Sequence, residues 1–107
     1  MMSLRRVPVD GKLTPSERKP KLLAVALDLA VGAGFQKVTR EMIASRAGVS
    51  GGLISRYWTA PELATAILDE AIRLGVLPVV AQGLAARHPS ALAASESIRR
   101  AAAESLI

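Results

Sequence analysis

Apolar residues recur at steps of three and four along most of the chain, which is the spacing of a helix with one buried face. The first such run follows Thr14-Pro15-Ser16-Glu17, a capping box with proline at the first helical position. Gly32 and Gly34 provide a stop signal at the other end. The pattern therefore predicts a helix over 15–32, whose apolar face contains Leu22, Leu23, Ala26, Leu27 and Ala30.

Two short helical runs come next and are separated by a glycine. Thr39 is a good N-cap for the first run, and Ala47 closes it. Gly48 can adopt the left-handed conformation that a tight turn between helices needs. Ser50 caps the second run, which we expect to reach Tyr57 or Trp58. Two short helices joined in this way form a helix-turn-helix.

The rear half of the chain predicts further helices. A second capping box, Thr59-Ala60-Pro61-Glu62, opens a longer helix, and Leu77-Pro78 breaks or kinks it. A further helix is expected over 79–86 and a last, alanine-rich one over about 90–105.

The composition supports an all-α fold. Half of the 107 residues are hydrophobic, but only Phe35, Tyr57 and Trp58 are aromatic, and alanine and leucine dominate the rest. We expect a three-helix helix-turn-helix core, followed by a longer fourth helix and one or two short C-terminal helices. The chain then divides into a flexible basic arm (1–13), a helix-turn-helix domain (14–75) and a C-terminal segment (76–107).

Charge is unevenly distributed along the chain. The net charge is +5, and positive residues gather in 1–21 and 40–58, whereas 61–75 is net acidic. A basic front half indicates a polyanionic partner, although a basic tail can also serve only to keep a protein in solution. The chain has no cysteine, no secretory signal and no run long enough to span a bilayer, so a cytoplasmic protein without membrane contact is expected.

Residues that carry catalysis or bind metals are not grouped in a recognisable pattern. His88 stands alone and is expected in a loop, while Asp69 and Glu70 are neighbours on a helix and therefore diverge. No phosphate-binding loop or nucleophile–base arrangement stands out. The sequence thus predicts neither an enzyme nor a bound cofactor or metal.

Residues 21–70 resemble the DNA-binding region of the TetR family of bacterial transcription regulators. The similarity rests on Gly34-Phe35, Val38-Thr39, Ile43-Ala44, Ala47-Gly48-Val49-Ser50, Gly52, Ile54, Tyr57-Trp58 and Glu62. Three positions depart from the family pattern, because Arg40, Ser55 and Pro61 replace a threonine, a tyrosine and a lysine. Only 76–107 follow the domain, so the resemblance does not imply the family's large ligand-binding domain. No small-molecule effector is expected.

In this motif the start of the second short helix approaches base edges in the major groove. Ser50, Gly51 and Gly52 form that start, and the two glycines either admit the backbone to the groove or mark a frayed helix end. Leu53 contacts either a thymine methyl group or the core. Ser55 and Arg56 are candidate base-reading residues, and Arg56 has a phosphate contact as its alternative.

Three further residues are assigned to the phosphate backbone or the core. Arg40, at the start of a helix, is a candidate phosphate ligand, with a solvated arginine as the alternative. Thr39 is first a helix cap and second a phosphate ligand. The resemblance assigns Tyr57 to a phosphate and turns Trp58 inward.

The most direct interpretation is a sequence-specific repressor that binds a palindromic site on double-stranded DNA as a homodimer. The dimer contact is expected on the apolar rear residues, which are Leu74, Val76, Leu77, Val79, Val80, Leu84, Leu92 and Ile98. The alternative is a helical protein-interaction module that uses the same apolar face without binding DNA.

Overall fold

The computed structural model describes residues 14–105, and the regular structure in this range consists of helices alone. The expected all-α class is confirmed. The proposed basic arm, 1–13, lies outside the described residues. The helices are α1 (Pro15–Ala33), α2 (Arg40–Ala47), α3 (Gly51–Ser55), α4 (Ala60–Leu74), α5 (Leu77–Ala85), α6 (Pro89–Leu92) and α7 (Glu96–Glu104).

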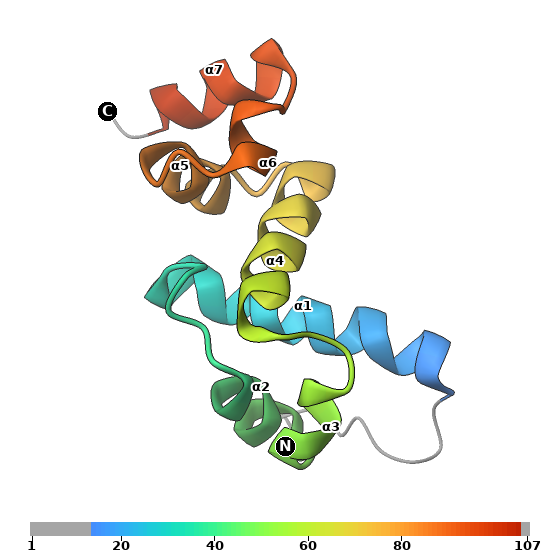
Figure 1. The fold of residues 1–107 in the computed structure, drawn as a ribbon. Coiled ribbons are helices and arrows are strands. Elements are labelled where there is room, and N and C mark those ends of the chain that lie inside the picture. The colour runs from blue at the N-terminus through green and yellow to red at the C-terminus, as the bar shows by residue number, and fades with distance from the viewer. Residues whose placement is uncertain (1–13, 106–107) are drawn as a thin grey trace, which may run out of the picture.

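The helices form two groups that α4 connects (Figure 1). At one end, α2 and α3 pack on each other beside α1, and at the other end α5, α6 and α7 pack together. Helix α4 contacts α1 along one part of its length and α5 and α6 along another. A direct contact between α1 and α5 joins the two groups a second time.

Side-chain caps fix where the front helices begin. The Thr14 hydroxyl accepts the Glu17 N–H at 3.3 Å, and the Glu17 carboxylate accepts the Thr14 N–H at 2.9 Å. The hydrogen bonds that the Glu17 carboxylate accepts from the Thr14 backbone and side chain hold its pKa below the usual value. Thr59 and Glu62 make the same reciprocal pair at the start of α4. Both predicted capping boxes are therefore present.

The core is continuous through both groups and is made largely of small and aliphatic side chains. Phe35 and Trp58 are the two buried aromatic residues, at 2% and 5% exposure. Alanines fill many of the remaining positions, which lets the helix axes approach closely. The fully buried members of this core include Leu22, Ala26, Ala30, Ile43, Ala47, Ile54, Leu63, Ile67, Leu68, Ala71, Val79 and Val80.

Three predicted helix boundaries were wrong. Helix α4 ends at Leu74, where Gly75 adopts a left-handed conformation, and Leu77-Pro78 begins α5 rather than breaking α4. Helix α3 ends at Ser55 rather than at Tyr57 or Trp58, because the chain tightens there: the Tyr57 N–H donates to Ile54 O at 3.0 Å, one residue short of the α-helical register. Three C-terminal helices are present in place of one or two. The expected helix over 90–105 is divided at Ala93–Ser95, where Ser95 caps α7 with its hydroxyl on the Ile98 N–H.

The chain turns sharply in the connection between α5 and α6. Arg87 adopts a left-handed conformation (φ 55°), and the following His88 N–H returns to Gly83 O at 2.9 Å. His88 then caps α6, since its ring Nδ1 accepts the Ser90 N–H at 3.1 Å. His88 thus lies in the loop between α5 and α6, as expected, and serves there as the cap of α6.

Gly83 lies where α5 meets α4 and α6. A Cβ atom at this position would lie 2.7 Å from both δ-methyl carbons of Leu68 and 3.0 Å from the Ala91 Cβ. Leu68 and Ala91 are themselves fully buried, so they have little room to move.

We predict that Gly83→Ala lowers the free energy of unfolding by about 1–3 kcal/mol, because overpacking outweighs the gain in helix propensity. The matched control is Gly32→Ala in α1, where nothing lies within 4 Å of the added Cβ. That control is expected to raise the free energy of unfolding by up to about 1 kcal/mol. Urea denaturation measures both, and equal effects of the two substitutions would contradict the packing of α5 described above.

Candidate nucleic-acid interface

The turn between α2 and α3 is built around Gly48. This residue has φ 76° and ψ 32°, a left-handed conformation that glycine adopts without steric cost. Its N–H donates to Ala44 O at 2.8 Å, and the Val49 N–H donates to the same oxygen at 3.0 Å. The Ser50 hydroxyl then accepts the Leu53 N–H at 3.3 Å and starts α3. The predicted tight turn and its cap are both confirmed.

Helix α3 has one face in the core and one face in solvent. Ile54 is fully buried, and Trp58 just beyond the helix is nearly so. Gly52, Ser55 and Arg56 are exposed. The structure thus turns these three predicted site residues outward together.

Three other predicted site residues are only partly accessible: Leu53, Gly51 and Tyr57 are half-buried. The Tyr57 ring lies 5.6 Å from the Trp58 ring and packs against the core, so a large part of this aromatic side chain has a structural role. The Ser55 hydroxyl donates to Gly51 O at 3.2 Å, within its own helix. Its lone pairs stay available to a donor, and its role in base reading stays a prediction.

The start of α2 carries the other two candidates. The Thr39 hydroxyl accepts the Met42 N–H at 3.1 Å, which confirms its role as a helix cap. Arg40 follows directly and is half-buried. Arg46, near the end of the same helix, pairs with Asp28 of α1 at 2.9 Å. Arg46 therefore ties α2 to α1, and Asp28 offsets its charge.

Lys19 is a cation that the sequence prediction did not place at this site. Its ammonium group lies 5.6 Å from the centre of the Trp58 ring, in cation–π geometry. The contact brings the start of α1 next to the end of α3. The basic stretch Arg18-Lys19-Pro20-Lys21 was the available signal, but only the fold shows which residue of that stretch meets Trp58.

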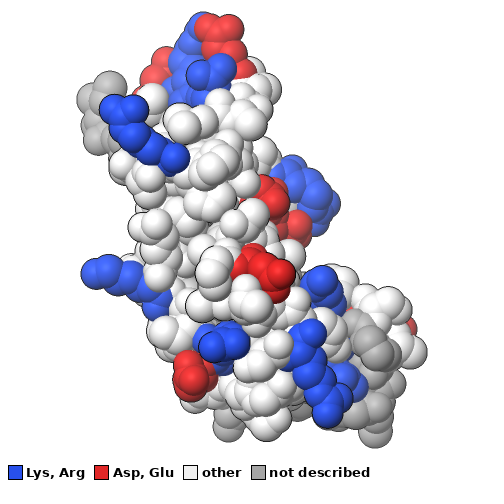
Figure 2. All heavy atoms as spheres, viewed as in Figure 1, with Lys and Arg blue, Asp and Glu red and all other residues white. Residues whose placement is uncertain are grey.

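The described front of the protein is positively charged. Residues 14–58 contain seven Lys and Arg against three Asp and Glu, whereas 59–105 contain four against five. Figure 2 shows Lys and Arg side chains gathered over the lower part of one face, where α1 and α3 lie, while charges of both signs mix at the opposite end. The exposed side of the helix-turn-helix therefore lies within the positively charged half of the described residues.

Other kinds of site find no support within residues 14–105. No helix in this range is both long and apolar enough to cross a membrane. No group of three or more histidine or acidic residues in this range is arranged to hold a metal ion.

The geometry defines an all-helical, helix-turn-helix class of DNA-binding domain. A family model for the bacterial regulatory proteins of the tetR family matches residues 22–60. This match supports a TetR-family N-terminal helix-turn-helix domain over these residues and suggests a DNA-binding transcription regulator. Regulators of this family are generally not enzymes. No curated protein and no solved structure matches the chain significantly.

We predict that Gly52→Ala raises the free energy of unfolding by up to about 1 kcal/mol, since alanine favours a helix over glycine. An added Cβ would have its nearest neighbour, the Ser50 hydroxyl, only at 4.0 Å. Urea denaturation of the variant measures this gain, and a lower stability would contradict the described conformation. The DNA affinity of the same variant separates the two interpretations of the glycines: a loss indicates close approach of the backbone to DNA, and no change indicates a frayed helix start.

Proposed function

We propose that this protein is a transcriptional repressor that binds a specific palindromic DNA site as a homodimer. Helix α3 enters the major groove of each half-site, with Ser55 and Arg56 directed at base edges. Arg40, Thr39 and Tyr57 contact the phosphate backbone on either side of the groove.

One observation carries this proposal: the matched helix-turn-helix domain leaves Arg56 exposed at the end of α3, within the positively charged half of the described chain. A guanidinium group offers two parallel N–H donors to the O6 and N7 atoms of guanine. Lys19 adds a cation on the adjacent start of α1. Electrostatic attraction and one strong base contact are thus available on the same surface.

A dimer follows from the small size of one helix-turn-helix, because two recognition helices about 34 Å apart read two successive major grooves. Fewer rear residues are available for the contact than the sequence suggested. Val79 and Val80 are fully buried within the protein's own core. Leu74 and Leu92 are about half exposed, at 54% and 51%, and are the better candidates for a contact between two copies.

The first test is a fluorescence-anisotropy titration with random-sequence duplexes and with a site selected from them, at two salt concentrations. We predict that Arg56→Ala lowers affinity for the selected site by about 5- to 150-fold, the loss expected for one bidentate base contact. Random-sequence binding is expected to change much less.

Arg100→Ala is the matched control, because Arg100 is an exposed arginine on α7 at the other end of the protein. A uniform loss of affinity on all duplexes would assign Arg56 to a phosphate instead. The slope of the logarithm of the binding constant against the logarithm of the salt concentration would then be smaller in magnitude by about 0.9. Absence of salt-dependent binding by the wild type would contradict the proposed function and favour the interaction module.

The dimer is tested by sedimentation of the free protein and of the complex with the selected duplex. We predict that Leu74→Glu shifts both toward the monomer, because it places a charge in an apolar contact. Val31→Glu, on an equally exposed apolar residue of α1, is expected to leave the assembly unchanged. A wild type that sediments as a monomer both free and on DNA would overturn the proposed dimer.

A further inference from the structure

Gln82 of α5 joins the C-terminal helices to the helix-turn-helix domain through both ends of its side-chain amide. Its Oε1 accepts the Phe35 N–H at 2.8 Å, and its Nε2 donates to Ala30 O at 3.2 Å. Ala30 lies in the last turn of α1, and Phe35 lies in the connection that leads to α2. One side chain thus satisfies a donor and an acceptor where α1 ends.

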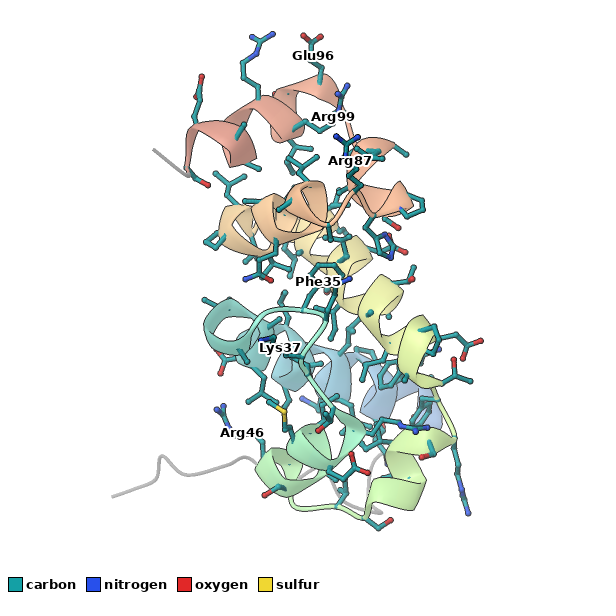
Figure 3. The ribbon with its side chains drawn as sticks, turned by 60° about the vertical axis from the view of Figure 1, so that its left-hand side comes forward. Phe35, Lys37, Arg46, Arg87, Glu96 and Arg99 are labelled. Atoms are coloured by element: carbon teal, nitrogen blue, oxygen red, sulfur yellow. The ribbon has the colours of Figure 1, made fainter. Side chains whose placement is uncertain are left out.

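Phe35 is held from a second direction by the same group of helices. Its ring lies 5.8 Å from the His88 ring in an edge-to-face arrangement, and His88 Nε2 lies 3.2 Å from the Thr65 hydroxyl of α4. Figure 3 shows Phe35 on the α1–α2 connection, where this connection faces the helices of the C-terminal half. The position of Phe35 therefore depends on α4, α5 and the α5–α6 connection together.

A short path leads from Phe35 to the DNA-facing surface. Val38 is buried three residues later, and Thr39 then caps α2. Helix α2 packs directly on α3. Only residues 36–39 separate Phe35 from the start of α2, so the place of Phe35 limits where α2 can begin.

We propose that Gln82 is a positioning residue for DNA recognition: its amide sets the angle at which α2 and α3 leave α1. This inference rests on the proposed function, since it concerns how the same surface is aligned. Through Gln82, the C-terminal segment then controls how α3 is aligned, besides any role it has in forming the dimer.

The glutamine amide supplies both bonds: it accepts the Phe35 N–H, and it adds a second hydrogen bond to Ala30 O, which already accepts the Gly34 N–H at 2.8 Å. A carboxylate can only accept. Gln82 borders a hollow of about 400 Å³ that Lys37 also lines, so an added charge there is partly solvated. A Gln82→Glu variant can therefore fold while it loses the bond to Ala30 O.

The experiment compares Gln82→Glu and Gln82→Leu with the wild type in the full chain. Each is titrated with the selected duplex and with a random-sequence duplex, and thermal unfolding gives the folded fraction at the assay temperature. Gln36→Glu is the matched control, because Gln36 is exposed on the same connection and the substitution adds the same charge.

We expect both Gln82 variants to lose about 5- to 20-fold in affinity for the selected duplex, with little change on the random one. Gln36→Glu is expected to weaken both duplexes equally. In Gln82→Glu, compared with the wild type at the same pH, the ratio of selected to random binding is expected to recover in part as the pH falls from 7.5 to 4.5, because a protonated carboxyl group donates again, as the amide does.

Two results would overturn the positioning role: an unchanged ratio in both variants, or equal losses on both duplexes that follow the folded fraction. Either one leaves wild-type binding intact and the proposed function standing. If the wild type itself fails to prefer any duplex, the proposed function fails, and the positioning role falls with it.

Discussion

A five-residue helix cannot hold its own conformation in water, and α3 is such a helix. Its geometry must come from what surrounds it. Ile54 anchors it in the core, Ser50 caps its start, and Trp58 fixes the chain just beyond its end. The surface proposed to read DNA is therefore only as rigid as the packing beneath it, and α2 is the helix that packs most closely on α3.

The packing that supports α3 relies on small side chains, which let the helices approach one another closely. Ala44 and Ala47 lie buried in α2, and Gly83 lets α4 and α5 touch at a distance that a Cβ would prevent. In such a closely packed core, even small changes of side-chain volume lower the stability. Gln82 adds directional contacts to this packing: two hydrogen bonds, one to the Phe35 N–H and one to Ala30 O.

The sequence predicted what local chemistry controls. Thr14, Thr39, Ser50 and Thr59 cap helices as expected, because each cap involves residues only three apart. Gly48 likewise takes its predicted left-handed conformation.

The contacts that the sequence did not predict are distant ones. Gln82 and Ala30 are separated by 52 positions, and His88 and Thr65 by 23. Helical propensity also suggested a continuous helix over 90–105, but α6 packs on α4 and α7 packs on α5, so the chain must turn between them.

Affinity and specificity for DNA place different demands on such a protein. Attraction between lysine or arginine and phosphate acts over about 8 Å at physiological ionic strength and tolerates mobile side chains. The excess of Lys and Arg over residues 14–58 meets that demand without fixed geometry. A bidentate base contact does not tolerate misplacement, because both hydrogen bonds must form at once. Under the proposed function, specificity therefore depends on buried residues that never touch DNA, whereas affinity depends on the charged surface, so the two properties can change independently.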